Sequence, residues 1–323
     1  MSIQSFIERA NDLASKTNPF LFVIDFEQKK PLIYTPEEAK NQNVFFDIAG
    51  SKNFEYFSQI RKKFEITTKN NFQDRYKTAF DRVQKHIKNG DSYLLNLTFP
   101  SEVSFRGTLK ELFYASKAPY KLFFKNQFVS YSPECFVKID GGKIFSYPMK
   151  GTGSAARPDA EELLINNSKE IAEHATIVDL IRNDLSRHAK KVKVNRFRYL
   201  DRIITQQEDL LQVSSEIQGE LKSNWHSNLG NIIWDMLPAG SVSGAPKTKT
   251  LEIIESVEDS PRGYYTGVYG FFDGQNLDSA VAIRFLEKQE NKFFYRSGGG
   301  VTAKSNCEEE YQELLDKIYV PTF

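Results

Sequence analysis

The chain has 323 residues, of which 40% are hydrophobic and 26% are charged, and its 43 Lys and Arg residues nearly balance 42 Asp and Glu residues. This profile is typical of a soluble globular protein with a sizeable core, and the near-neutral charge lacks the basic excess that marks nucleic-acid-binding proteins. No apolar run approaches the ~20 residues of a membrane span, and the polar, amphipathic start of the chain lacks the apolar core of a signal peptide.

The cysteines and histidines give no sign of a metal-binding framework. Cys135 and Cys307 lie in dissimilar contexts, and the four His residues are scattered along the chain. Reduced thiols in a cytoplasm are therefore the expected state. We expect a cytoplasmic protein without a zinc site, a nucleic-acid partner or a membrane partner.

The first 90 residues contain two helix patterns and two strand patterns. Apolar residues at helical spacing predict a helix over residues 3–13, which ends before Asn18 and Pro19. Residues 20–26 form a continuous apolar run that predicts a buried strand, and residues 43–48 predict another. Residues 50–68 show no clear pattern. A single apolar stripe over residues 76–87 predicts a second helix, which stops at Gly90.

Strand patterns dominate the next segment. Short runs of aromatic and β-branched residues, separated by turn residues, predict strands over residues 93–99, 120–125, 127–131, 135–139 and 143–147. Residues 109–116 form a helical interruption between the first two of these strands.

The second half of the chain mixes long helices with further strands. Helices are predicted over residues 160–166, 168–187, 228–236, 248–258 and 308–318, and strands over residues 192–199, 209–217, 267–272, 279–286 and 292–297. Groups of strands with helices between them, without regular βαβ alternation, favour one α+β domain over a doubly wound sheet.

Two pairs of glutamates have helical spacing. Glu170 and Glu173 share one face of a predicted helix, and Glu310 and Glu313 repeat that spacing on the last helix. An isolated pair of this kind most often lies on a solvated surface. Two such pairs beside Gly-rich segments favour Mg²⁺, which one or two protein carboxylates hold together with water and substrate oxygens.

Two Gly-rich segments and one arginine could bind anions. Residues 238–247 precede a predicted helix, where glycines allow close approach and backbone amides attract anions, yet they match neither a Walker A loop nor a dinucleotide-binding loop. Residues 298–300 follow a predicted strand and form either an anion nest or a tight bend. Arg284, on the predicted strand 279–286, is either a carboxylate ligand or an exposed cross-strand charge.

Lys150 and Glu134 are the candidate reactive groups. Lys150 lies between Pro148 and a Gly-Thr pair, which predicts a constrained turn. A surface charge, a phosphate ligand and a nucleophile are all possible roles, and only the nucleophile requires the lysine to be neutral. Glu134 lies at another strand junction and could act as a general acid if burial raises its pKa.

The order of these segments resembles the chorismate-utilising enzymes, the family of anthranilate, aminodeoxychorismate, isochorismate and salicylate synthases. The resemblance spans roughly residues 74–323, with residues 1–73 as a shortened N-terminal part, and rests on GDSYLLNLT at 90–98, SPE at 132–134, PMKGT at 148–152, AEHATIVDLIRND at 172–184, PAGSVSGAPK at 238–247, RGYYTG at 262–267, AIR at 282–284, GGGV at 298–301 and EYQE at 310–313. It implies one large α+β domain with two facing, mostly antiparallel β-sheets and helices packed outside.

Two positions distinguish the reactions within this family. Lys150 resembles the lysine implicated as a nucleophile in aminodeoxychorismate synthase component I, where anthranilate synthase usually has alanine. Leu94 stands where isochorismate-type enzymes carry a water-activating lysine. The combination implies amination of chorismate at C4. The alternatives are anthranilate formation, isochorismate or salicylate formation, and a non-catalytic partner subunit of the same fold.

The resemblance also implies roles for individual residues. Lys150 attacks the ring while Glu134 protonates the departing hydroxyl. Mg²⁺ is held by Glu173 and Glu313, with Glu310 assisting through water. Substrate contacts come from Thr152, Ser243, Tyr265, Arg284, Gly298, Gly299, Gly300 and Lys317. No segment resembles a glutaminase, so the implied source of ammonia is a separate glutamine amidotransferase subunit, and a lyase would then release 4-aminobenzoate for folate.

Several positions depart from the family pattern. Leu94 replaces a glutamine common in the aminodeoxychorismate group, Gln212 replaces a histidine, and Lys304 replaces an aspartate near the expected metal helix. Ala239 and Ser243 replace Gly and Thr, and residues 153–156 lack the usual arginine-rich run.

Overall fold

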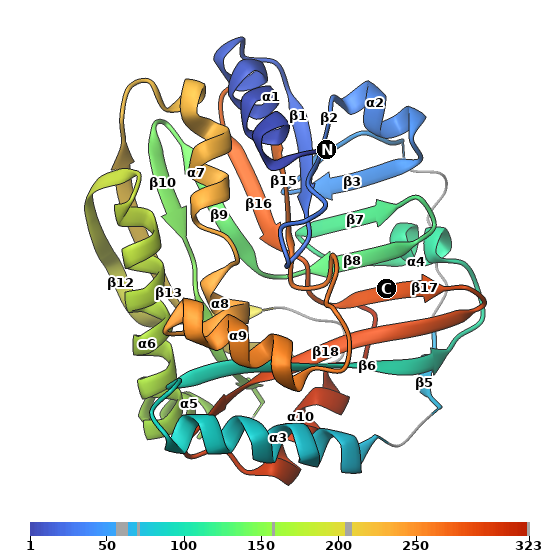
Figure 1. Ribbon diagram of the computed structural model, residues 1–323, viewed down its shortest axis with the longest axis vertical. Coiled ribbons are helices and arrows are strands. Elements are labelled where there is room, and N and C mark those ends of the chain that lie inside the picture. Colours follow the sequence, from blue (N-terminus) through green and yellow to red (C-terminus); the bar gives the residue numbers. More distant parts are fainter. Residues whose placement is uncertain (56–63, 70–71, 157–158, 204–208, 322–323) are drawn as a thin grey trace.

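Two antiparallel β-sheets form the body of the molecule. The computed structural model describes residues 1–55, 64–69, 72–156, 159–203 and 209–321, and within these residues each sheet has nine strands (Figure 1). The first sheet contains β1 (Phe20–Ile24), β2 (Leu32–Tyr34), β9 (Cys135–Asp140), β10 (Lys143–Ser146), β11 (Met149–Ser154), β12 (Ala189–Ile203), β13 (Leu210–Leu221), β15 (Val268–Phe272) and β16 (Leu277–Val281). The second contains β3 (Val44–Ile48), β4 (Ser51–Lys52), β5 (Thr67–Thr68), β6 (Leu94–Ser104), β7 (Tyr120–Phe124), β8 (Phe128–Ser132), β14 (Gly244–Ala245), β17 (Phe285–Gln289) and β18 (Lys292–Thr302).

Most helices pack on the outer sides of the two sheets (Figure 1). They are α1 (Ile3–Ser15), α2 (Pro36–Asn41), α3 (Gln73–Lys88), α4 (Leu109–Ala115), α5 (Ala160–Asn166), α6 (Ser168–Ser186), a 3₁₀ turn at Trp225–Asn228, α7 (Leu229–Asp235), α8 (Gly240–Ser243), α9 (Lys247–Val257) and α10 (Cys307–Asp316). Helices α1, α6 and α7 share a core with the first sheet, whereas α3, α9 and α10 share one with β6 and β18. Among the residues that the structure describes, none of the helices combines the length and apolar character needed to span a membrane.

Strand β1 shows why residues 20–24 form a continuous apolar run. Phe20, Phe22 and Ile24 pack into the core beneath α1 and α7, while Leu21 and Val23 point to the other face and pack against residues of the second sheet. Successive side chains of a strand alternate between faces, so both faces of this strand are buried and all five residues are apolar. The core shared by the two sheets confirms the predicted α+β fold with facing antiparallel sheets and helices outside.

The predicted strand over residues 279–286 is wrong, because the chain changes sheets within it. β16 ends at Val281 in the first sheet, and β17 begins at Phe285 in the second. Arg284 lies between them with φ at +50°, a left-handed conformation that interrupts a strand. The strands before and after the crossover are both buried and need apolar residues. The apolar pattern in the sequence therefore runs from one strand into the next without marking the change of sheet. Arg284 is therefore placed where the two sheets meet.

The glycine triplet is not a turn. β18 continues through residues 298–300, which pair in register with residues 96–98 of β6. A Cβ atom on Gly298 would lie 2.6 Å from the carbonyl oxygen of Leu97, and one on Gly300 would lie 2.9 Å from Lys150 Nζ. These glycines leave room for atoms that approach the strand closely, and the prediction of a nest or bend was wrong.

Lys150 also lies in a strand rather than in the predicted turn. β11 pairs with β13, and the register shifts between Met149 and Thr152. Gly151, inside this irregularity, has φ at +79°. A β-bulge re-aims the side chains of the strand that carries it, which accounts for the proline and glycine on either side of Lys150.

Candidate active site

Lys150 on β11 and Glu173 on α6 form a buried ion pair. Lys150 Nζ lies 2.9 Å from Glu173 Oε2, and the Glu173 side chain is only 4% exposed. Burial favours the neutral lysine, but the charge and hydrogen bond of Glu173, followed by the charges of Glu170 and Glu313, outweigh it and raise the pKa of Lys150. The lysine is therefore an ammonium ion in this arrangement.

Strand β18 forms the floor beneath Lys150. A Cβ atom at Gly300 would lie 2.9 Å from Lys150 Nζ and 3.1 Å from Leu94 Cδ1. Leu94 is 4% exposed and offers only hydrocarbon at this place. The glycine therefore makes room for the lysine head group, and Leu94 provides no base that could activate a water molecule.

Two carboxylates of α10 approach the neighbouring glycine. A Cβ atom at Gly299 would lie 3.4 Å from Glu310 Oε2 and 3.9 Å from Glu313 Oε1. Glu310 is 2% exposed, whereas Glu313 is 55% exposed and pairs with Lys317 at 2.7 Å. Glutamates from α6 and α10 thus meet at the same glycine strand. Glu173 and Glu310 are buried, so they do not fit the interpretation of the two glutamate pairs as solvated surface charges.

The carboxylates suit a hard cation. Glu173 Oε1 is buried, and the described part of the chain provides no hydrogen-bond partner for it. Among the described residues, no three His, Cys, Asp or Glu side chains are close enough together to form a metal site unaided. Mg²⁺ takes one or two carboxylates and completes its coordination with water and substrate oxygens, so Glu173 together with an α10 carboxylate fits such an ion.

Glu134 lies beyond the end of β8 and is held by two serines. Its backbone amide donates to Ser132 Oγ at 3.0 Å, and Ser241 of α8 donates to its carboxylate. Burial raises the pKa of Glu134, while the hydrogen bond from Ser241 and the charges of Arg284, Lys150 and Lys317 lower it without cancelling the shift. A raised pKa is what a carboxyl needs to act as a general acid near neutral pH.

Arg284 and Lys317 bring positive charge to the same region. The Arg284 guanidinium lies over the ring of Tyr319 at 5.2 Å, and its buried Nε has no hydrogen-bond partner within the described residues. Lys317 Nζ donates to the carbonyl oxygen of Gly298 at 2.8 Å. Burial lowers the pKa of Lys317, with Glu313 acting in the opposite direction. An unmet guanidinium donor beside a lysine is suited to a carboxylate ligand.

Comparison with known proteins identifies the family. A family model described as chorismate binding enzyme matches residues 34–322. The chain belongs to the chorismate-binding enzymes. A protein of Pasteurella multocida (strain Pm70), named as an uncharacterized PabA-like protein, is 49% identical over 322 residues, which are 99% of each chain.

More distant chorismate-binding enzymes carry specific names. The aminodeoxychorismate synthase component 1 of Bacillus subtilis (strain 168) is 31% identical over 265 residues, which cover 76% of this chain and 54% of that protein. The anthranilate synthase component 1 of Aquifex aeolicus (strain VF5) is 30% identical over 309 residues, covering 91% and 60%. The solved menaquinone-specific isochorismate synthase of Escherichia coli superposes with a TM-score of 0.74 over 97% of this chain and 80% of that one, and its 16% identity supports the fold alone.

Three further residues were predicted to contact substrate in this chorismate-binding enzyme. Thr152 lies on β11 opposite Gln212, and its side chain is outside the described part of the structure. Ser243 is buried and donates its hydroxyl to the carbonyl oxygen of Ala239 at 3.0 Å, so it stabilises its own turn. Tyr265 is 3% exposed and packs against the ring of Phe285.

A pocket adjoins Glu134 on the side of α6. It is small, and its walls come from β9, β10, α6 and α8, including Glu134, Ser241, Asp184 and Ser146. Asp184 forms a buried ion pair at 2.6 Å with Lys247, which joins α6 to the start of α9. Sequence reasoning missed Ser241, although residues 238–247 had been singled out, and it had no signal for Tyr319.

Proposed function

We propose that this chorismate-binding enzyme is the synthase component of an aminodeoxychorismate synthase, which aminates chorismate at C4 to give 4-amino-4-deoxychorismate. The observation that carries the proposal is the placement of Lys150 Nζ over Gly300, with Leu94 beside it. A lysine in the site supplies a potential nucleophile, and a leucine at the neighbouring position gives water no activating group.

Sequence similarity does not choose between the two aminating reactions. The aminodeoxychorismate synthase component of B. subtilis and the anthranilate synthase component of A. aeolicus are 31% and 30% identical to this chain. The proposal therefore rests on Lys150, since the resemblance associates a lysine at this place with amination at C4 and an alanine with amination at C2.

In the proposed mechanism, cationic groups orient the substrate first. Arg284, with its unmet Nε donor, and Lys317 bind carboxylate oxygens of chorismate. The extended glycines of β18 carry no side chain, so the substrate ring can lie against this strand beside Lys150 and the α10 glutamates. Thr152 adds a further contact in the proposal.

Mg²⁺ is the proposed cofactor, held by Glu173 and Glu313 with Glu310 assisting through water. When bound, it supplies positive charge that fixes the ring carboxylate of chorismate and offsets the buried glutamates. The fit rests on the buried Oε1 of Glu173, which has no hydrogen-bond partner within the described residues.

The covalent step requires Lys150 to lose its proton. The ion pair with Glu173 Oε2, 2.9 Å from Nζ, holds the lysine charged, so this contact must open before Nζ gives up its proton. Neutral Lys150 attacks C2 of the ring, the double bonds shift, and the C4–O bond breaks while Glu134 donates the proton that releases water. Ammonia then forms a bond to C4 and expels Lys150 from C2, and the surplus proton on the new amine returns to Glu134, so that chorismate and ammonia give 4-amino-4-deoxychorismate and water.

The proposed source of ammonia is a glutamine amidotransferase subunit encoded separately. None of the described residues forms a second catalytic unit of that kind, since both sheets belong to the chorismate-binding fold. The relative in P. multocida carries a PabA-like name, which supports such a partner.

Incubation of the purified protein with chorismate, Mg²⁺ and an ammonium salt tests the proposal. We expect chorismate to disappear and 4-aminobenzoate to form only after an aminodeoxychorismate lyase is added. Fluorescent anthranilate without added lyase would show amination at C2 instead, and isochorismate without use of ammonium would show attack of water at C2 with loss of the C4 hydroxyl. Chorismate that stays unchanged, with intact folding, would favour a non-catalytic subunit.

A further inference from the structure

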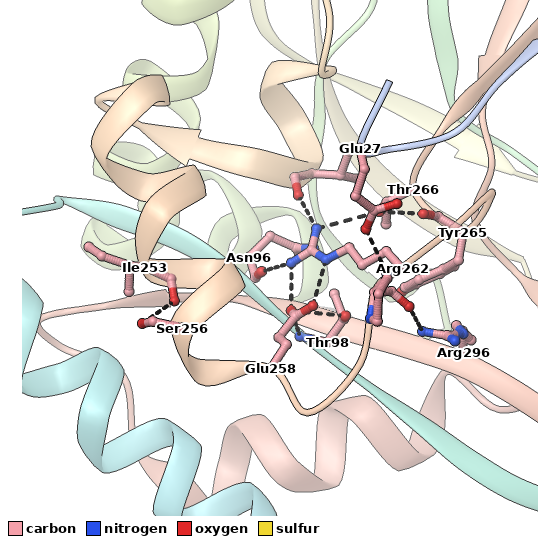
Figure 2. Close-up of polar contacts among 12 residues, drawn as sticks. Glu27, Asn96, Thr98, Ile253, Ser256, Glu258, Arg262, Tyr265, Thr266 and Arg296 are labelled. Carbon is pink, nitrogen blue, oxygen red and sulfur yellow. Dashed lines mark hydrogen bonds and ion pairs between the residues drawn. The ribbon is translucent and has the colours of Figure 1, made fainter. Parts of the chain in front are cut away.

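The segment at residues 262–267 has no role in the mechanism above, although it was one of the motifs that identified the family. Its first residue, Arg262, is 1% exposed. Figure 2 shows the Arg262 guanidinium directed toward Asn96 and Glu258, with Thr266 nearby. The side chain also lies over the ring of Phe26 at 4.3 Å. A charge buried so completely needs partners for all its donors.

Arg262 has such partners for each of its five side-chain N–H groups. Nε and Nη2 donate to the two oxygens of Glu258 at 2.9 and 2.6 Å. Nη2 also donates to the carbonyl oxygen of Asn96 at 2.5 Å. Nη1 donates to the carbonyl oxygen of Val242 at 2.8 Å and to Thr266 Oγ1 at 3.4 Å. The planar fork of an arginine has five donors in fixed directions, and here they reach four separate segments.

Two of these acceptors lie next to residues of the active site. Val242 follows Ser241, which donates to the carboxylate of Glu134. Asn96 pairs across the sheet with Gly300, the glycine beneath Lys150. The Arg262 guanidinium therefore connects two segments. One is the α8 backbone next to Ser241, which holds the proposed acid, and the other is the β6 backbone opposite Gly300, which lies beneath the proposed nucleophile.

Glu258 extends this connection along β6. Its Oε1 accepts from the backbone amide of Thr98 at 2.9 Å and from the Thr98 hydroxyl at 3.0 Å. Thr98 pairs with Gly298, whose carbonyl oxygen accepts from Lys317. The carboxylate thus fixes the part of β6 that supports the other end of the glycine triplet.

We propose that the Arg262–Glu258 pair is a positioning device that sets the distance between the α8 turn and the glycine strand during chorismate turnover. The inference rests on chorismate turnover by this family and not on which product the chain makes. Arg262 and Glu258 touch no reacting atom. They act by holding Val242, Asn96 and Thr98, so their loss should slow the reaction without abolishing the fold.

If the Arg262–Glu258 pair had a purely structural role, a folded protein that lacks both charges would keep the kcat of the wild type. Replacing both members of a buried ion pair by apolar residues of similar volume is often neutral for stability. The paired variant Arg262→Met with Glu258→Met therefore removes the positioning bonds without leaving a buried charge. The matched control is Arg296→Met with Glu287→Met, another buried Arg–Glu pair with a 2.6 Å contact, whose arginine donates to Glu287 and to the carbonyl oxygen of Pro261.

The test follows loss of chorismate, whatever product forms, together with amide hydrogen exchange of residues 240–245. We expect the Arg262–Glu258 variant to lower kcat on the order of 10²-fold, with KM changed by less than about threefold, and to speed exchange in that segment. The control should keep kcat within about threefold. A folded Arg262–Glu258 variant with wild-type kcat and exchange would overturn the proposal.

A second variant covers the case in which the paired variant does not fold. Arg262→Lys keeps the charge opposite Glu258 but has three donors on a flexible stem, so the bonds to Val242 and Asn96 cannot both be kept. We expect the same fall in kcat and the same faster exchange in folded protein. Wild-type values for Arg262→Lys would overturn the proposal independently. A wild-type chain that makes anthranilate would refute the C4 reaction and leave this test intact.

Discussion

The Nζ atom of Lys150 lies 2.9 Å from Oε2 of Glu173, and this contact joins the strand that carries the proposed nucleophile to the helix that carries a proposed metal ligand. The pair has two consequences. Glu173 holds Lys150 in its charged form while the contact lasts, and Lys150 is the cation that keeps Glu173 from being a buried, isolated charge. Any change to one residue therefore alters the other.

Two substitutions at Lys150 separate a nucleophile from a positive charge. Lys150→Ala removes both, whereas Lys150→Arg keeps the charge beside Glu173 but cannot lose its proton. If Lys150 attacks the ring, both variants should lower kcat for the aminated product by at least about 10³-fold. Single-turnover assays with chorismate and ammonium measure this. Activity retained by Lys150→Arg and lost by Lys150→Ala would assign an electrostatic role instead.

The same variants should differ in stability. Lys150→Ala leaves the carboxylate of Glu173, which is 4% exposed, without its cation, and an unsatisfied buried group costs about 1–3 kcal/mol. Lys150→Arg should cost less, because a cation remains. Urea unfolding gives the comparison. Lys249→Ala is the control: its pair with Glu252 is 50% and 61% exposed, so its loss should leave stability almost unchanged.

The pH dependence of turnover should report the environment of Glu134. Burial raises the pKa of Glu134, and the hydrogen bond from the Ser241 hydroxyl lowers it. A general acid must be protonated, so kcat should fall as pH rises through this pKa. Ser241→Ala removes an effect that lowers the pKa, and the falling limb should therefore move to higher pH. Profiles of kcat against pH with saturating chorismate provide the measurement.

Glu134→Gln is the reference for that profile. It cannot donate a proton, so the falling limb should vanish and kcat should drop by about 10²–10⁴-fold, the usual contribution of general acid catalysis. If the limb persists in Glu134→Gln, or if Ser241→Ala leaves it in place, another group is responsible for it.

Local patterns in the sequence were enough to locate most of the elements. The helical spacing of residues 3–13 corresponds to α1, residues 160–166 form α5 as predicted, and the stripe at 76–87 lies within α3. Such patterns depend on which side of an element is buried. They gave no warning of the crossover at Arg284, because apolar residues continue through it. They also placed a turn at residues 298–300. These glycines make room for side chains that approach the strand from other elements, and a local pattern does not reveal such contacts.

The candidate site was predictable only as far as motifs reach. Lys150, Glu173 and Glu310 were named from sequence, and the structure brings them to one glycine strand. Ser241 and Glu134 are 107 positions apart in the sequence. Serine and glutamate occur in many settings, so their residue types do not predict this hydrogen bond. Two partners of Arg262, at Val242 and Asn96, are backbone carbonyls: any residue supplies a carbonyl oxygen, so no sequence pattern marks these acceptors.

The Asp184–Lys247 pair should contribute mainly when one member is removed. Its side chains are 7% and 15% exposed, and Lys247 Nζ also donates to the carbonyl oxygen of Met236 at 3.2 Å. Lys247→Met alone should cost about 3–5 kcal/mol, because it leaves Asp184 buried and uncompensated, while Asp184→Leu together with Lys247→Met should come close to wild-type stability. Urea unfolding measures both. Additive losses in the double variant would contradict this account.

Alanine substitutions at two adjacent glycines should divide the site into its lysine part and its carboxylate part. In Gly300→Ala the new methyl would lie 2.9 Å from Lys150 Nζ, closer than ordinary contacts allow, so the lysine must move and kcat should fall. In Gly299→Ala it would lie at ordinary contact distances, 3.4 Å from Glu310 Oε2 and 3.9 Å from Glu313 Oε1, so the carboxylates can stay in place, but the methyl would take up space beside them and Mg²⁺ with its water should bind more weakly.

Both glycines lie in extended backbone within β18, so neither substitution forces an unfavourable φ, and folding should survive in each. Calorimetric titration with Mg²⁺ and turnover at saturating Mg²⁺ measure the two effects separately. We expect Gly300→Ala to lower kcat on the order of 10²-fold with Mg²⁺ affinity near that of the wild type, and Gly299→Ala to regain most of its kcat when Mg²⁺ is raised. The opposite result would be weaker Mg²⁺ binding in Gly300→Ala and a low kcat in Gly299→Ala that added Mg²⁺ does not restore. It would mean that Lys150, rather than the α10 glutamates, controls Mg²⁺ binding, because the lysine and the cation would then compete for Glu173.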